Sequence, residues 1–156
     1  MKGSKRLKLY LDTTIPSYVF ALDSPERMEI TRRFMKLRFL PAYLMVISEV
    51  VLWELGAARE LKKVLLMEQV AGLPVLPMNH AANHLAVEYI RQGILPLGSI
   101  DDARHVALAT LNNMDALVSW NFGHLVNIRR SKAINDVNEV WRLPHIEIIT
   151  PEEVLE

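Results

Sequence analysis

The sequence predicts an α/β fold in which a mainly parallel β-sheet is covered by helices on both faces. Two observations predict this class: short apolar runs alternate with longer segments of helical periodicity, and 51% of the residues are hydrophobic, enough for a substantial core. The 156 residues also contain no repeat, low-complexity tract or linker that would divide the chain. We therefore expect a single domain over residues 1–156.

The first half of the chain is expected to contain three strands and the helices between them. LKLYL (7–11) is a short apolar strand. Thr13, Thr14 and Pro16 then begin a helix, because hydroxyls cap free N–H groups and proline fits the first turn. The segments that follow are a serine-capped helix (24–39), the strand AYLMVI (42–47), a helix (48–72) broken near Gly56 and ended at Gly72, and the strand LPVLPM (73–78).

The second half is expected to continue the alternation. Asn79 caps a helix that ends at Gly93, and an alanine-rich helix follows over residues 99–113. The remaining segments are the strand DALVSW (115–120), a loop followed by helical turns (121–143), the strand HIEIIT (145–150) and a last turn opened by Pro151. Strands that alternate with helices in this way indicate a parallel sheet.

The composition limits the kinds of site and location. There is no cysteine, so disulfides and thiolate zinc sites are excluded and a cytoplasmic location is expected. The longest apolar runs are too short to span a bilayer, so no membrane association is expected, and the basic start does not resemble a signal peptide. The formal net charge is zero, although basic clusters occur at 5–8, 32–38 and 129–132. Charge therefore neither establishes nor excludes an RNA substrate.

Four polar residues stand where a parallel sheet would bring them together. Asp12 and Asn121 follow strands, whereas Glu54 and Asp102 lie in helices that follow strands. Polar sites in such sheets form beyond the carboxyl ends of the strands, and right-handed winding brings the starts of the next helices to that edge. Converging carboxylates repel unless a cation neutralises them, and oxygen ligands favour Mg²⁺ or Mn²⁺. Such an ion can activate water for attack on a phosphodiester, which is nuclease chemistry.

Each of these acids also has an ordinary structural interpretation. Asp12 can end a strand or cap a helix, and Glu54 can be a solvated helix residue. Asp102 stands three residues after Ser99 and can close a capping box with it. Glu49 competes with Glu54, but five helical residues place the two about 140° apart around the axis. Only one of them can face a shared site, and we expect Glu54 there.

The histidines are expected to be mainly structural. His105, one turn after Asp102, lies on the same side of its helix and can orient a carboxylate or contact phosphate, although a structural role is favoured. His80 and His84 have the spacing of a metal pair, but no carboxylate motif accompanies them, so zinc is not expected. His124 lies in a loop near the predicted site.

Three further residues flank the predicted site. Trp120 and Phe122, on either side of Asn121, are expected to pack against the protein rather than to stack on bases. Asp101 is expected to interact favourably with the helix dipole without touching the metal.

Five motifs occur in the order found in a known family. They are LYLDTTIPSYV, ISEVVLWELG, DDARHVALAT, LVSWNFGHLVN and the closing IEIITPEEV. On these motifs nearly the whole chain resembles the PIN domain family and, more narrowly, its VapC-like toxin–antitoxin branch, in the subset with SWNF after the fourth strand. The resemblance implies a three-layer α/β/α PIN-like domain and a Mg²⁺- or Mn²⁺-dependent endoribonuclease.

The resemblance also implies roles for individual residues. The family's first acid matches Asp12, the acid of its E-L pattern matches Glu54, and the acid of its D-A-x-H-x-A-x-A pattern matches Asp102. These three are the implied metal ligands, and Ser119 matches the polar residue that supports the site. Asn121 stands where many family members have a fourth acid. Its amide oxygen can accept a hydrogen bond or ligate weakly, but it brings no negative charge.

The implied substrate is single-stranded RNA, and the implied partners are a small antitoxin protein and a second copy of the chain. The apolar helical segments 32–40 and 61–70 are candidate surfaces, although burial in the core explains them equally well. The alternative function is a catalytically silent PIN-like module that binds RNA or protein, which Asn121 and the zero net charge favour. An aspartyl-phosphate hydrolase is disfavoured because Thr14 stands where that chemistry usually places a second acid.

Overall fold

The structure, a computed structural model, describes residues 5–156 and contains a five-stranded, all-parallel sheet. The strand order across the sheet is β3-β2-β1-β4-β5. The bounds are β1 (Leu7–Leu11), β2 (Tyr43–Ser48), β3 (Val75–Leu76), β4 (Ala116–Val118) and β5 (Glu147–Ile149). The predicted parallel α/β fold is confirmed.

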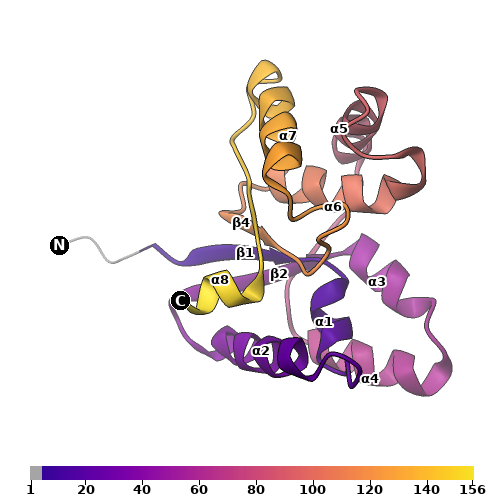
Figure 1. The fold of residues 1–156 in the computed structure, drawn as a ribbon, viewed down its shortest axis with the longest axis vertical. Helices are drawn as coiled ribbons and strands as arrows, with labels where there is room; N and C mark the ends of the chain where they lie inside the picture. The colour runs from indigo at the N-terminus through magenta and orange to yellow at the C-terminus, as the bar shows by residue number, and fades with distance from the viewer. Residues whose placement is uncertain (1–4) are drawn as a thin grey trace.

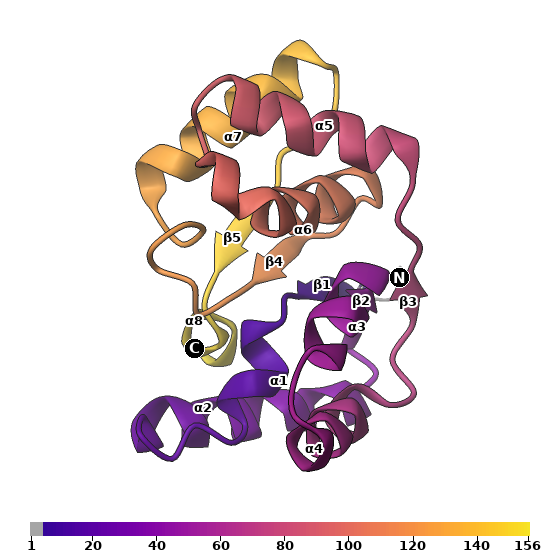
Figure 2. The same ribbon diagram turned by 90° about the vertical axis from the view of Figure 1, so that its right-hand side faces the viewer.

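Helices cover both faces of this sheet, as Figure 1 shows. One face carries α5 (His80–Arg91), α6 (Ile100–Leu111) and α7 (Ile128–Val140); the other carries α1 (Thr14–Tyr18), α2 (Pro25–Met35), α4 (Glu60–Val70) and the C-terminal α8 (Pro151–Leu155). The helix α3 (Glu49–Gly56) contributes to both cores, through Val50 and Val51. Two short 3₁₀ turns complete the set, at Lys36–Phe39 and Leu97–Ser99. The view in Figure 2 shows the same three layers from the side.

Alternation along β1 explains why the sheet has two cores. Tyr10 belongs to the core beneath α5, α6 and α7, whereas Leu9 and Leu11 belong to the core on the opposite face. Successive side chains of a strand point to opposite faces, so a strand covered on both faces buries apolar side chains on both, as Leu9, Tyr10 and Leu11 do. The central place of β1, between β2 and β4, puts the carboxyl end of this strand in the middle of the sheet edge. Asp12 follows it directly.

Two elements differ from the sequence prediction. The third strand has only two residues instead of six, because Pro74 and Pro77 flank it and proline has no N–H to extend the ladder. The region predicted as a loop with helical turns contains a continuous helix of 13 residues, α7, whose N-cap Asn127 accepts a hydrogen bond from the backbone N–H of Arg130. The break near Gly56 and the helix end before Gly72 are as predicted.

Within the described residues, no helix combines the length and the apolar character that crossing a membrane requires. The organisation as a single domain stays a prediction.

Candidate active site

Two of the predicted site residues meet at the carboxyl ends of neighbouring strands. Asp12 follows β1 and Ser119 follows β4, and these strands are paired in parallel. The hydroxyl of Ser119 donates a hydrogen bond of 2.5 Å to Oδ2 of Asp12. Both side chains are buried, with Asp12 only 2% exposed. The fold therefore joins residues that are 107 positions apart in the sequence.

The second oxygen of Asp12 accepts hydrogen bonds from the next helix. Oδ1 receives the backbone N–H of Thr14 at 3.0 Å and the Thr14 hydroxyl at 2.5 Å. Burial raises the pKa of Asp12, and it outweighs the lowering effect of the His105 charge and of the hydrogen bonds from Ser119 and Thr14. The protein alone thus leaves the charged form of this carboxylate under-compensated, which is the situation that a bound cation relieves.

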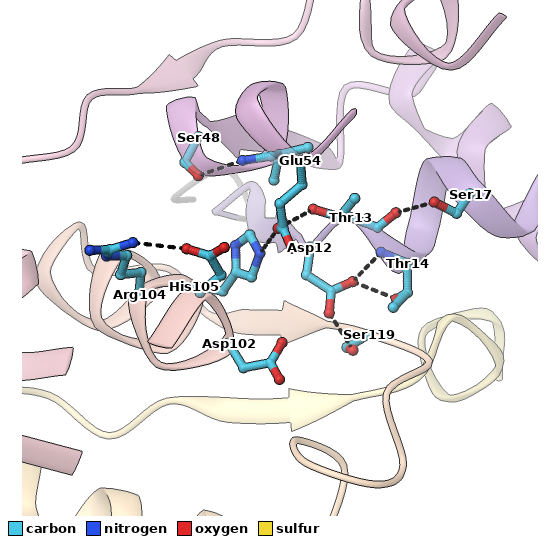
Figure 3. A network of polar contacts seen from close by, with 12 residues as sticks. Asp12, Thr13, Thr14, Ser17, Ser48, Glu54, Asp102, Arg104, His105 and Ser119 are labelled. Carbon is cyan, nitrogen blue, oxygen red and sulfur yellow. Dashed lines mark hydrogen bonds and ion pairs between the residues drawn. The ribbon is translucent and has the colours of Figure 1, made fainter. Parts of the chain in front are cut away.

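Glu54 reaches the same edge of the sheet from the last turn of α3. Its Oε1 accepts a hydrogen bond from the Thr13 hydroxyl at 2.6 Å and lies 2.6 Å from Nε2 of His105 (Figure 3). These contacts and the charge of His105 lower the pKa of Glu54, although its partial burial acts in the opposite direction. Glu54 is therefore fixed in its charged form, pointing toward α6.

His105 is the centre of the polar network, buried in α6. Its Nδ1 lies 2.7 Å from the hydroxyl of Tyr10, which in turn lies 2.7 Å from the hydroxyl of Ser48. Burial by itself lowers the pKa of His105, but the hydrogen bond to Glu54 raises it. The negative charges of Asp12, Glu54 and Asp102 raise it further, so that it lies above its usual value. Glu54 thus contacts this imidazole directly, and the charges of Asp12 and Asp102 act on it as well.

Asp102 belongs to this group but is held less tightly. It lies in the first turn of α6, and its Oδ2 is 3.1 Å from Nδ1 of His124. The capping box considered for Asp102 is not formed, because the hydroxyl of Ser99 makes no cap hydrogen bond to α6 and instead lies 3.0 Å from the same nitrogen of His124. Asp102 thus has no capping partner in Ser99, and its side chain is 22% exposed.

The amide of Asn121 serves the loop after β4. Its oxygen accepts the backbone N–H of His124 at 2.9 Å, and its own backbone N–H donates to the Ser119 hydroxyl at 2.9 Å. Asn121 thereby links the side chain that contacts Asp12 to the histidine that contacts Asp102. The structure thus places its amide oxygen on a backbone N–H of the loop.

The competing acids are directed elsewhere. Glu49 accepts the backbone N–H of Met78 at 2.7 Å, and Asp101 pairs with Arg104 at 2.9 Å. His84 packs edge-on against Trp141, with ring centroids 5.4 Å apart. Glu49 and Asp101 are therefore natural control positions for Glu54 and Asp102.

The candidate ligand atoms are of the chemical type that hard divalent ions prefer. Across residues 5–156, no three acidic or imidazole side chains are already closed around one point. Nevertheless Oε2 of Glu54 and Oδ1 of Asp102 take part in none of the hydrogen bonds within that range, and all candidate donors are oxygen atoms. A cation would compete with His105 for Glu54, because both are attracted by the same carboxylates.

The sequence indicated His105 only as an accessory group and did not single out Tyr10. Tyr10 is buried in the middle of the sheet, and its hydroxyl bridges Ser48 and His105. A tyrosine among the leucines of a short strand was the available signal, because a buried hydroxyl needs a partner.

Replacing His105 tests whether this network stabilises the fold. We expect His105→Leu to lower the free energy of unfolding by about 1–3 kcal/mol, because the Tyr10 hydroxyl and Glu54 each lose a partner. Urea unfolding without added metal measures the change. His80→Leu, at an exposed position, is the control and should change stability by no more than about 0.5 kcal/mol. Equal stabilities of the two variants would contradict the structural role of His105.

Three solved structures have a similar fold. A chain of VapBC2 from Rickettsia felis, bound to a DNA fragment from its promoter, is 15% identical with a TM-score of 0.54, over 92% of this chain and 98% of that chain. A chain of VapBC-1 from nontypeable Haemophilus influenzae is 17% identical with a TM-score of 0.59, over 94% and 99%. A chain of VapBC-5 from Mycobacterium tuberculosis, of the VapBC family of toxin–antitoxin systems, is 17% identical with a TM-score of 0.55, over 92% and 98%.

At these identities the likeness concerns the fold, and no curated protein matches this chain in sequence. A family model gives the sequence-level evidence: the PIN domain matches residues 9–123. That range runs from β1 past Asp12, Glu54, Asp102 and Asn121, and so includes every predicted site residue. This chain belongs to the PIN domain family.

Proposed function

We propose that this protein is a Mg²⁺- or Mn²⁺-dependent endoribonuclease that hydrolyses phosphodiester bonds in single-stranded RNA. The observation that supports the proposal is the contact of Glu54 in α3 with His105, an imidazole on which the charges of Asp12 at the end of β1 and of Asp102 in α6 also act. Carboxylates gathered at the carboxyl edge of a parallel sheet are suited to a hard cation. Membership of the PIN domain family supports the same function.

In this proposal Asp12, Glu54 and Asp102 would hold the ion. The ion, when bound, would supply activation of water and stabilisation of the negative charge that develops on the phosphoryl group. Ser119 and Thr14 position the two oxygens of Asp12, while Thr13 and His105 position Glu54. These positioning residues hold the carboxylates in defined orientations before the substrate arrives.

Asn121 supports the site rather than completing it with a fourth charge. Its amide oxygen already accepts the N–H of His124 and has one further lone pair for a water molecule. The set therefore holds at most three negative charges, so we expect weaker metal binding than a four-carboxylate site would show.

The identity of the nucleophile distinguishes this chemistry from metal-free ribonuclease chemistry. We expect cleavage of a defined RNA oligonucleotide in Mn²⁺ to persist, within about tenfold, when the nucleotide before the scissile bond carries a 2′-deoxy sugar. Attack by water needs no 2′-hydroxyl, whereas attack by the ribose itself does. Loss of all cleavage with the 2′-deoxy substrate would rule out hydrolysis by water, and cleavage that survives EDTA would rule out the metal.

An antitoxin partner and a homodimer are part of the proposal. The three structures with a similar fold are VapBC assemblies, and one of them is described as a toxin–antitoxin system. The helix α4 presents Leu61 and Val64 to the exterior while it buries Leu66 and Val70, so it has an apolar strip for a partner. We propose that the protein acts in the cytoplasm as the toxin of such a pair. Growth arrest on expression, relieved by co-expression of a small protein encoded next to this one, would support the pairing, and the absence of any growth effect would contradict it.

A catalytically silent PIN module that binds RNA or protein is the second candidate. The contact of His105 with Glu54 favours it, because a protonated His105 would compensate the charge of Glu54 without a metal ion. Calorimetric titration with Mn²⁺ separates the two functions. A silent module should bind no Mn²⁺ at this site, whereas the nuclease should show saturable binding that depends on Asp12.

A further inference from the structure

The loop after β4 presents an exposed aromatic ring close to the candidate active site. Ser119 contacts Asp12, and Phe122 follows three residues later. Three peptide units span at most about 11 Å between Cα atoms, so the ring is tied to the rim of the acidic site. Trp120 is 4% exposed but Phe122 is 46% exposed. Trp120 is therefore buried, whereas Phe122 rests against the Trp120 ring, with centroids 6.2 Å apart, and leaves part of its own ring exposed.

Arg27 from α2 lies against this ring. Its guanidinium carbon is 4.8 Å from the centroid of Phe122 and 5.3 Å from the centroid of Trp120. Both distances lie in the range of cation–π attraction. Across residues 5–156 no carboxylate forms an ion pair with Arg27, although Arg27 is exposed. Its positive charge therefore remains available to a ligand.

Trp120 makes a rigid base for these two exposed groups. Its indole N–H donates to the buried hydroxyl of Thr31 in α2 at 2.8 Å, and its backbone N–H donates to the Thr14 hydroxyl at 2.9 Å. Thr14 also donates to Asp12, so one residue connects the aromatic base to the carboxylate. The ring of Tyr18 packs against Trp120, with centroids 5.8 Å apart. The position of Phe122 and Arg27 is thus coupled to that of Asp12.

We infer that Phe122 and Arg27 form a stacking platform for one nucleobase of the substrate, adjacent to the phosphate that is cleaved. This inference rests on the proposed ribonuclease function and adds a substrate subsite to it. Aromatic rings and arginine planes bind unpaired bases by stacking, and arginine also attracts the neighbouring phosphate. With a net charge of zero, general electrostatic attraction to RNA is weaker than in a basic protein, so a local stacking contact adds affinity for RNA.

A stacking contact favours unpaired nucleotides. A base held in a duplex has both faces covered by its neighbours, whereas a single strand can offer one face to Phe122. The platform therefore gives a physical reason for preference of single-stranded over double-stranded RNA. It does not select one base over another by hydrogen bonding.

The test compares Phe122→Ala and Arg27→Gln with Phe122→Trp and the control Phe39→Ala, in Mn²⁺. Phe39 is exposed and lies in the 3₁₀ turn after α2, where its ring contacts Arg38. We expect Phe122→Ala to raise KM for a single-stranded oligonucleotide about tenfold, with kcat changed less than about threefold. Phe122→Trp should restore KM, Arg27→Gln should raise it, and Phe39→Ala should leave it unchanged. Thermal unfolding verifies that the variants are folded.

Abasic substrates identify the base that stacks. One abasic nucleotide is placed at each position of the oligonucleotide in turn. At a single position near the scissile bond, the abasic nucleotide should raise KM of the wild-type enzyme about as much as Phe122→Ala raises KM for the intact substrate. At that position the abasic nucleotide should cause no further rise in KM of Phe122→Ala. Equal sensitivity of the two enzymes at every position would overturn the inference while leaving the ribonuclease function intact.

Other outcomes separate this inference from the proposed function. Unchanged KM in Phe122→Ala, together with lost binding of a co-purified antitoxin, would make the ring a protein contact and overturn the RNA subsite. If the wild-type protein does not cleave RNA, the proposed function fails. Fluorescence anisotropy with the same oligonucleotide, carrying a label, then measures RNA binding and tests whether Phe122 contributes to it. Weaker binding by Phe122→Ala would then support the platform as part of an RNA-binding module. Equal or absent binding by both proteins would overturn it.

Discussion

Asp12→Asn is expected to reduce Mn²⁺-dependent RNA cleavage by at least about 10³-fold. Asp12 is the most buried of the three carboxylates, and burial raises its pKa, so it is the group most in need of a cation. A metal ion contributes several kcal/mol to stabilisation of the transition state, and each 1.36 kcal/mol corresponds to about a factor of ten. Initial rates on a fluorescent oligonucleotide, and calorimetric Mn²⁺ affinity, measure the loss.

The same substitution should leave the protein folded. The Asn oxygen can still accept the N–H of Thr14, and the Ser119 hydroxyl can turn to accept from the amide. Because a neutral amide replaces a buried carboxylate, we expect unchanged or slightly higher thermal stability without metal. Full activity in Asp12→Asn would contradict the metal-dependent nuclease, and an unfolded variant would contradict the expectation that folding does not need the Asp12 carboxylate.

The second large effect is a contrast between paired positions on two helices. Glu54→Gln and Asp102→Asn should each lower cleavage and Mn²⁺ affinity by about 100-fold or more, which exceeds the 10- to 100-fold cost of removing a supporting group at a metal site. The matched controls are Glu49→Gln on α3 and Asp101→Asn on α6. Each control removes the same charge from the same helix, and should change activity less than about threefold.

The contrast depends on where these side chains point. Glu54 lies against Thr13 and His105, whereas Glu49 lies against Met78. A general electrostatic effect of losing one negative charge would act on both members of a pair. Similar losses in Glu49→Gln and Glu54→Gln would therefore contradict a site built on Glu54.

The fold could be predicted because its signals are local. Apolar strands, helix caps and glycine stops lie within a few residues of the elements that they determine. The helix α7 was not predicted in full because its apolar side chains are sparse. It depends on distant contacts instead: Asn138 accepts a hydrogen bond from Tyr89, and Asn135 bonds to the backbone of Ile146. Tertiary contacts of this kind override a weak local pattern.

The acids of the candidate site could be predicted from their places at strand ends and in the following helices. The central position of His105 could not, because its partners are 95 residues away at Tyr10 and 51 residues away at Glu54. A histidine on an alanine-rich helix is compatible with packing, with a metal site or with a charge pair. Likewise, the short-range match of Ser99 and Asp102 suggested a capping box, but His124 from a distant loop engages both side chains.

A crystal grown with saturating Mn²⁺ and measured at the manganese absorption edge tests the central claim most directly. We expect one anomalous peak beyond the carboxyl end of β1, bound by oxygen atoms of Asp12 and of at least one of Glu54 and Asp102. The distances should be about 2.0–2.3 Å, as for small hard divalent ions. A crystal whose Asp12, Glu54 and Asp102 hold no manganese, with His105 still bonded to Glu54, would contradict it.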